Sequence, residues 1–210
     1  MNFRKLQKDE YAYWDNFVDS SPQGSIYVKS FYLESKDCPF SINIIEQDNI
    51  IYGGIVLCKN ELGVHSNPLF IKYLGILYAD DNILGSRVKR RVSKIDRLII
   101  ENLSKIFIFS YSFDPAFSNW LNLYWGNFHQ TTKYTYQIHF NDSINFRDEY
   151  TSKVKSPINR AKKNQLKIVN INLEDFCAIL NKSYKAKNTK APYKKKNLIR
   201  FLNSLINHDC

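Results

Sequence analysis

The chain has 210 residues, of which 44% are apolar and 15% aromatic, and this composition excludes an intrinsically disordered polypeptide. No apolar run reaches the roughly 18 residues that span a bilayer, and the N-terminal stretch lacks the apolar core of a secretory signal, so the sequence predicts a cytoplasmic protein without an integral membrane segment. The net charge of +10 comes entirely from residues 149–210, where 14 Lys and Arg face 4 Asp and Glu, so we expect this third of the chain to attract anions.

The first part of the chain predicts two helices followed by three strands. Aromatic residues at helical spacing indicate helices over residues 8–19 and 28–35. Apolar runs separated by turn-forming residues predict strands at 41–47, 50–58 and 72–79. Because strand follows strand here, we expect these segments to pair with one another.

The next stretch begins with an amphipathic helix and ends with a strand. Residues 86–106 predict the helix, because their apolar residues recur at three and four positions: Val88, Val92, Ile95, Ile99 and Leu103. Residues 106–112 predict a short strand buried on both sides, and residues 115–126 predict a helix or a loop. Strict alternation of apolar and polar residues at 134–140 predicts a further strand. These elements together predict an α/β (α+β) fold.

The basic third of the chain predicts the order helix, strand, helix, helix. Ser156 and Pro157 are typical of an N-cap and a first helical position, and a kinked helix that continues through Pro157 is the alternative. Residues 167–171 predict a strand, Asn172 opens the next helix, and residues 195–206 predict the last one.

The predicted strand at 167–171 has no neighbouring strand in the basic third. Because a single strand cannot satisfy its two edges, it either joins the sheet of the first part or belongs to a shortened version of a longer protein. The second interpretation is favoured.

The cysteines are scattered, and no cluster of metal-ligating residues accompanies them. Cys38, Cys58, Cys177 and Cys210 have neither CxxC spacing nor histidines nearby at ligand distance. This pattern predicts reduced thiols, without a zinc site or a disulfide framework.

Several stretches in order resemble the FemABX and GNAT-like group of double-domain aminoacyl- and acyltransferases. They are SPQGSIYVKSFYLES, NPLFIKYLGILYADD, YTYQIHF, KVKSPINRAKKNQLKIV, DFCAILNKSYKAKN and APYKKKNLIRFL. The resemblance implies a first GNAT-like domain over residues 1–145, with a mixed sheet flanked by helices. It also implies that residues 146–210 are the start of a second, incomplete GNAT-like domain.

The resemblance further implies a binding site for a phosphorylated or nucleotide-linked sugar acceptor. Lys29 matches the phosphate-binding lysine of the first domain, and Lys155 stands where an arginine is usual, which loses bidentate geometry. If Ser156 caps a helix, the N–H groups after Pro157 would form an anion cradle beside Lys155 and Arg160. The alternative is that these cations are exposed and solvated.

Two residues at the end of a predicted strand complete the expected site. Asp80 matches the acidic residue that, in the group, could orient an amine nucleophile or accept its proton, and Asp81 is its immediate rival. A turn-forming Asp-Asp-Asn sequence explains both equally well. Tyr78 could close the acceptor pocket, with packing in the core as the alternative.

The function implied by this resemblance is transfer of an aminoacyl or acyl group to an amine of a cell-wall or polysaccharide precursor. The donor would be acyl-CoA or aminoacyl-tRNA, with no permanently bound cofactor. The sequence has no Gly-rich loop of the Q/R-x-x-G-x-G/A type that holds the pyrophosphate of acyl-CoA in ordinary GNAT enzymes. The alternative is a non-catalytic basic module that binds tRNA or another polyanion.

Overall fold

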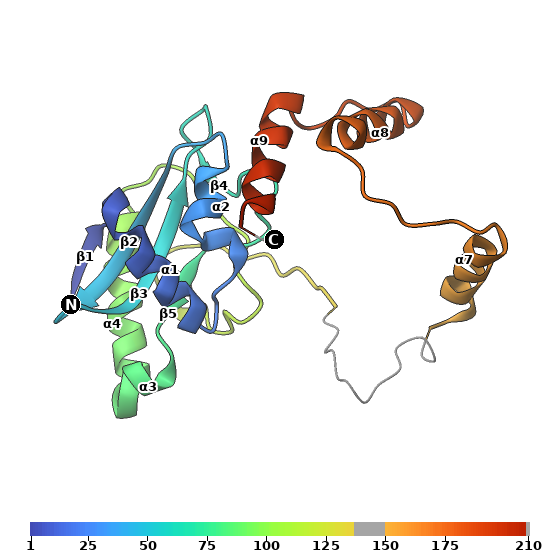
Figure 1. The fold of residues 1–210 in the computed structure, drawn as a ribbon. Helices are drawn as coiled ribbons and strands as arrows, with labels where there is room; N and C mark the ends of the chain where they lie inside the picture. The colour runs from blue at the N-terminus through green and yellow to red at the C-terminus, as the bar shows by residue number, and fades with distance from the viewer. Residues whose placement is uncertain (137–149, 209–210) are drawn as a thin grey trace.

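The computed structural model describes residues 1–136 and 150–208, which form a mixed fold of helices and strands (Figure 1). The strands are β1 (Asn2–Lys5), β2 (Phe40–Gln47), β3 (Ile50–Cys58), β4 (His65–Ser66), β5 (Ile76–Tyr78) and β6 (Phe109–Ser110). The α-helices are α1 (Tyr11–Ser20), α2 (Ser30–Glu34), α3 (Asp81–Leu84), α4 (Val88–Leu103), α5 (Leu121–Trp125), α7 (Ser152–Lys163), α8 (Leu173–Ala186) and α9 (Lys195–Ile206). Short 3₁₀ turns lie at Lys8–Glu10, Ile26–Val28 and Gly85–Arg87.

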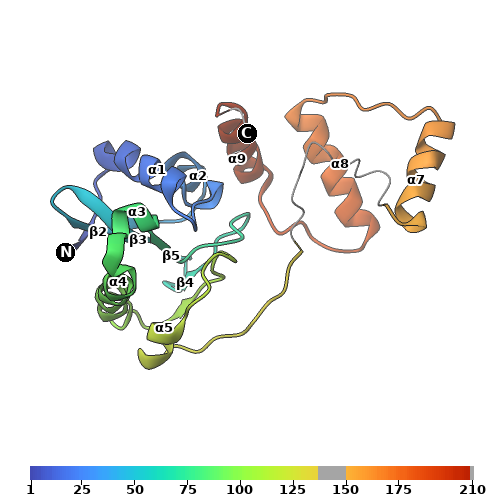
Figure 2. The ribbon, with the colours of Figure 1, turned by 90° about the horizontal axis from the view of Figure 1, so that it is seen from below.

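The main sheet has four antiparallel strands in the order β1-β2-β3-β5. Helices α1 and α2 cover one face of it, and α4 covers the other (Figure 2). A separate two-stranded sheet pairs β4 with β6 in parallel. The expected α/β fold class is therefore confirmed, with an antiparallel main sheet.

Two adjacent glycines in β3 set the distance between the sheet and the helices on its two faces. A Cβ atom on Gly54 would lie 2.7 Å from Cζ3 of Trp14 in α1, and one on Gly53 would lie 2.9 Å from Cγ2 of Ile95 in α4. Successive residues of a strand point to opposite faces, so one Gly-Gly pair serves both helices. Trp14 and Ile95 are fully buried as a result.

The strands predicted at 41–47 and 50–58 are confirmed, and they form a tight hairpin. Asp48 and Asn49 connect them with φ angles of 53° and 59°, the left-handed geometry that suits a two-residue hairpin loop. The strand predicted at 72–79 is shorter than expected, since β5 contains three residues.

The sequence analysis missed β1, because its four residues alternate weakly and carry two cations. Arg4 explains why the strand forms. Its guanidinium pairs with Glu46 of β2 at 2.6 Å and with Glu10 at 2.8 Å, and these hydrogen bonds raise the pKa of Arg4. Arg4 thereby ties the sheet edge to the turn that leads into α1.

Two strands predicted in the middle of the chain differ from the structure. Residues 106–112 form only the two-residue strand β6, and Phe107 is 99% exposed rather than buried on both sides. Of the strand predicted at 134–140, residues 134–136 are exposed and not in a strand, and residues 137–140 lie outside the described residues.

The predicted amphipathic helix at 86–106 corresponds to α4, and its apolar stripe faces the sheet as expected. Ile95, Ile99 and Leu103 are buried. Asp96 is buried in the same stripe, which the sequence analysis did not predict. Cys38, Cys58 and Cys177 are free thiols, as expected, and Cys210 lies outside the described residues.

The basic third begins with a helix that differs from the predicted one. Helix α7 starts after Thr151 and continues through Pro157, so the alternative of one continuous helix is confirmed and the N-cap at Ser156 is wrong. The strand predicted at 167–171 is also wrong. This segment is extended and unpaired, and the side chain of Ile168 is fully exposed, because no described strand lies beside it.

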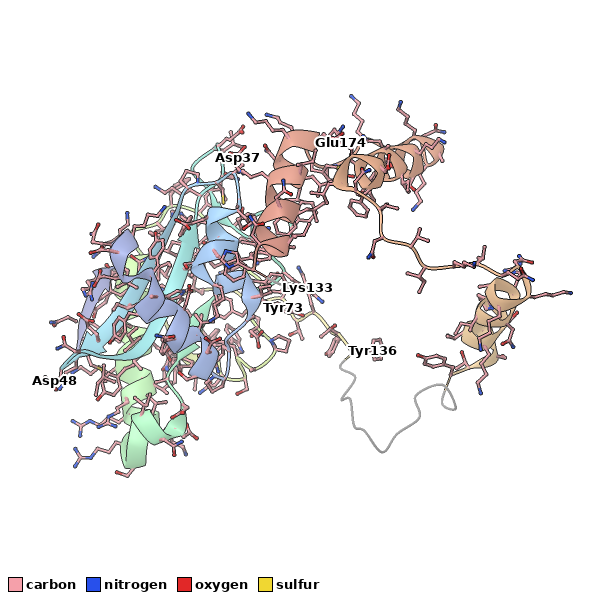
Figure 3. All side chains as sticks on the ribbon, viewed as in Figure 1. Asp37, Asp48, Tyr73, Lys133, Tyr136 and Glu174 are labelled. Atoms are coloured by element: carbon pink, nitrogen blue, oxygen red, sulfur yellow. The ribbon has the colours of Figure 1, made fainter. Side chains whose placement is uncertain are left out.

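Helices α8 and α9 form as predicted, and α9 returns to the body of the protein. The side chain of Asn172 caps α8 by accepting a hydrogen bond from the N–H of Asp175 at 2.8 Å. Helix α9 packs on α2 (Figure 1). Asp37, which lies beside α9 in Figure 3, pairs with Arg200 at 3.3 Å and accepts a hydrogen bond from Asn197 at 2.9 Å.

The contact between α2 and α9 encloses the side chain of Lys36. Its Nζ lies 3.2 Å from the ring centre of Phe201 and 3.9 Å from that of Tyr32, with Phe70 as a third ring at 5.4 Å. This nitrogen is buried and has no hydrogen-bond partner among the described residues. The ring faces attract an ammonium group, but burial prevails and lowers the pKa of Lys36 to about 7.

No helix within residues 1–136 and 150–208 has the length and apolar character to cross a membrane.

Replacement of Gly54 by Ala should destabilise the protein. The added Cβ would meet both Trp14 and the carbonyl oxygen of Asn43, 2.8 Å away. We expect a loss of about 1–3 kcal/mol in the free energy of unfolding, measured by urea denaturation. Ser93→Ala, on the exposed side of α4, is the control, and equal stability of the two variants would contradict the close approach.

Replacement of Lys36 by Met should change how stability depends on pH. Because the folded pKa is about 7 and the ordinary value is 10.5, folding of the wild type must release a proton between these values. Its stability therefore rises as the pH increases from 7 towards 10.5. Lys36→Met should be more stable than wild type at pH 7, with a difference that shrinks as the pH increases.

The measurement is urea denaturation of both proteins at several pH values from neutral upwards. Lys89→Met, which removes an exposed lysine of α4, should follow the pH dependence of the wild type. Parallel curves for wild type and Lys36→Met would show that this amine is not desolvated.

Candidate functional site

Lys29 lies between α1 and α2, where it holds the two helices together. Its Nζ donates a hydrogen bond to the carbonyl oxygen of Asp15 at 2.7 Å and pairs with Asp19 at 2.6 Å. The side chain is only 18% exposed, so the prediction of a solvated lysine does not describe it. Asp15 also accepts hydrogen bonds from the N–H and hydroxyl of Ser30. An incoming phosphate would have to compete with Asp19 for this ammonium group.

Tyr78 ends β5 and points into a polar cluster beneath the sheet. Its hydroxyl donates a hydrogen bond to Oδ1 of Asp96 at 2.5 Å, and Asn122 donates to Oδ2 of the same carboxylate at 2.6 Å. The ring of Tyr78 stacks on that of Phe117. On the main chain, the N–H of Tyr78 donates a hydrogen bond to Oε1 of Gln23 at 3.0 Å. This bond gives a partner to a backbone donor of β5 that no neighbouring strand accepts from.

Burial dominates the electrostatics of this cluster. It raises the pKa of Asp96, while the hydrogen bonds from Tyr78 and Asn122 oppose the rise because they favour the charged form. Burial, followed by the nearby Asp96 charge, also raises the pKa of Tyr78. Tyr78 is therefore the hydrogen-bond donor and Asp96 the acceptor.

Sequence reasoning missed Asp96, although a signal was present. Asp96 lies four residues after Val92 and seven before Leu103, on the apolar stripe of the predicted helix. A carboxylate in such a stripe is expected to be buried and hydrogen-bonded.

Asp80 caps the short helix α3 immediately after β5. Its Oδ1 accepts hydrogen bonds from the N–H groups of Asn82 at 2.8 Å and Ile83 at 3.1 Å. Asp80 is half-buried. Within the described residues, its Oδ2 takes part in no hydrogen bond or ion pair. The turn-forming interpretation of Asp80 is therefore confirmed for one of its oxygens, and the other remains open to a ligand.

Lys155 and Arg160 are exposed on α7, which lies apart from the main sheet and from α2 in both views (Figures 1 and 2). Tyr78 and Asp80 therefore lie at the end of β5 with different side-chain partners, and the structure does not place Lys155 or Arg160 beside Lys29. Residues 167–171, which follow α7, are not in a strand and do not pair with the sheet.

The anion cradle predicted after Pro157 does not form. Because α7 starts before Lys153, the N–H groups that follow Pro157 lie in the helix interior. There they bond to carbonyl groups one turn earlier.

The space beside β5 is small. A cavity lined by Gln23, Ser25, Gly75 and Asp114 has a volume of about 10 Å³, which suits about one water molecule. This cavity is too small for a sugar nucleotide, and Asp80 is not among the residues that line it. Among the described residues, no group of three or more His, Cys, Asp or Glu could hold a metal ion.

Comparison of the chain with models of protein families, with curated proteins and with solved structures found no match.

Replacement of Tyr78 by Phe should destabilise the protein, because it removes a hydrogen bond to the buried carboxylate of Asp96. The ring can remain stacked on Phe117, but Asp96 loses one of its two donors. We expect the free energy of unfolding at pH 7 to fall by about 1–3 kcal/mol. The pKa of Asp96 should rise further, because a hydrogen bond that favours its charged form is gone.

The sign of the pH dependence follows from the raised pKa of Asp96. Such a carboxyl group contributes most to stability at low pH, and that contribution is lost as the pH rises through its folded pKa. The deficit of Tyr78→Phe should therefore be smaller at acid pH than at pH 7 in urea denaturation. Tyr124→Phe, at an exposed ring, is the control. A deficit that does not vary with pH would mean that Asp96 is uncharged throughout.

Proposed function

We propose that the chain is part of an acyltransferase of FemABX or GNAT type, which acts on an amine of a phosphorylated or nucleotide-linked sugar. The proposal rests on the resemblance of six stretches of sequence. The arrangement of an antiparallel sheet between two helical layers is compatible with it. The observation that carries the site is Asp80, which stands at the end of β5 with one carboxylate oxygen unused by the described residues.

Acyl transfer requires an acceptor amine that is deprotonated and held in line with the acyl carbonyl. The amine nitrogen attacks the carbonyl carbon, the new C–N bond forms, and the bond to the thiol of CoA or to the ribose oxygen of tRNA breaks. Oδ2 of Asp80 would orient the amine and take its proton. Because Oδ1 is fixed by two N–H groups of α3, the free oxygen has a defined direction.

The three cations expected at the site differ in how they could bind the acceptor: Lys29, Lys155 and Arg160. Lys29 would bind an acceptor phosphate only by exchanging its contact with Asp19 for the phosphate. Lys155 and Arg160 would reach the same acceptor only if α7 moved towards β5, so the proposal does not depend on them.

The test is a binding titration with UDP-glucosamine, which carries a free amine, and with UDP-glucose, which does not. Asp80→Asn removes the negative charge but should leave α3 intact, because Asn caps a helix as well as Asp does. We expect Asp80→Asn to weaken UDP-glucosamine binding about three- to tenfold, the range of an exposed charge pair, and to leave UDP-glucose binding unchanged.

Asp81→Asn, at the neighbouring exposed carboxylate, is the matched control and should bind both ligands as wild type does. If wild type and Asp80→Asn bind UDP-glucosamine with the same affinity, and each binds UDP-glucose equally well, the assignment of an amine site at Asp80 is wrong. That result would favour the alternative function, a basic module for tRNA or another polyanion, which does not distinguish the two nucleotide sugars.

A further inference from the structure

Helix α7 carries a narrow apolar stripe on its surface. Val154, Ile158 and Ala161 are spaced at i, i+4 and i+7, which places them on one face of the helix. Val154 is 45% exposed and Ile158 is 38% exposed. In both views, no labelled helix or strand lies against α7 (Figures 1 and 2).

Cations border this stripe on both sides. Lys153 and Arg160 come directly before Val154 and Ala161, and Lys155 and Lys162 come directly after them. Since residues seven apart lie nearly above one another on a helix, these four cations form two rows along the borders of the stripe. The opposite face carries the small polar side chains of Ser152, Ser156 and Asn159 together with Lys163.

The chain that follows α7 continues the same combination of charge and apolar surface. Leu166 is 71% exposed, Val169 is 70% exposed, and Ile168 is fully exposed. Lys167 lies between them. We call residues 152–171 the basic arm.

We propose that the basic arm binds to the surface of a bilayer that contains anionic lipids. A helix with this pattern lies in the plane of the interface, with its apolar stripe towards the acyl chains. The lysine and arginine side chains on its borders extend outward to the phosphates of the lipid headgroups. The aliphatic side chains of 166–171 enter the same layer.

The aliphatic residues favour a lipid surface over a nucleic acid. A surface for single-stranded nucleic acid combines cations with aromatic rings on which the bases stack. The basic arm has no aromatic residue, and its exposed apolar side chains are aliphatic. A bilayer removes these side chains from water, whereas a phosphate backbone does not. This inference is independent of the proposed acyl transfer.

The test is flotation of the full-length chain with vesicles of phosphatidylcholine alone and of phosphatidylcholine with about 30% phosphatidylglycerol, a typical anionic fraction. We expect wild type to float with the anionic vesicles only. Val154→Ser/Ile158→Ser keeps every charge, and Lys153→Glu/Arg160→Glu keeps the stripe. Each double variant should reduce the bound fraction about tenfold.

Two control variants separate the basic arm from the rest of the surface. Lys89→Glu/Lys94→Glu changes the net charge equally but lies on the exposed side of α4, and Leu62→Ser removes an aliphatic side chain that is 86% exposed. Both controls should float as wild type does. Circular dichroism confirms that each variant is folded.

Three outcomes would overturn the proposal. The first is that wild type does not float with anionic vesicles. The second is that Val154→Ser/Ile158→Ser floats as well as wild type, which would show that the stripe does not enter the bilayer. The third is that excess tRNA binds the arm and leaves no vesicle binding, which would identify a nucleic-acid surface.

Discussion

The adjacent glycines of β3 determine how closely the helical layers approach the sheet. Gly54 admits the indole of Trp14 from one side, and Gly53 admits Ile95 from the other. Because β3 is the inner neighbour of β5, the position of α4 against Gly53 also fixes where Asp96 meets Tyr78. The polar cluster at the end of β5 therefore depends on two residues that have no side chain.

Two carboxylates near the end of β5 have different roles, because their surroundings differ. Asp96 is buried and receives two side-chain hydrogen bonds, so its role is to hold β5, α4 and α5 together. Asp80 is only half-buried and uses one oxygen to cap α3. Of the two, Asp80 is the one that a ligand can reach. Position relative to solvent, more than residue type, separates the structural acid from the candidate functional one.

The sequence predicted correctly those elements that follow from a pattern of neighbouring residues. The hairpin of β2 and β3 follows from two apolar runs around Asp48 and Asn49, and α4 follows from its apolar repeat. β1 escaped prediction because its stability comes from Arg4 contacting Glu46, a residue distant in the chain. Residues 167–171 have the composition of a strand but no partner, and composition alone cannot supply one.

The same distinction applies to the candidate site. Tyr78 and Asp80 are neighbours in the chain, so a sequence pattern could place them together. Lys29 and Lys155 belong to distant segments, and helix α7, which carries Lys155, lies apart from the main sheet and from α2. Asp96 lay on a recognisable apolar stripe, but its partners Tyr78 and Asn122 come from other elements. Only the folded chain reveals that network.

The enclosure around Lys36 has a consequence for synthesis of the chain. Asp37, next to Lys36, and its partner Asn197 are 160 positions apart, so α9 leaves the ribosome long after α2. At about 5–20 residues per second, the interval is on the order of ten seconds or more. During that time Tyr32 and Phe70 lack their cover, and the amine is hydrated. The nascent protein therefore exposes an aromatic surface that can bind other apolar groups until α9 packs over it.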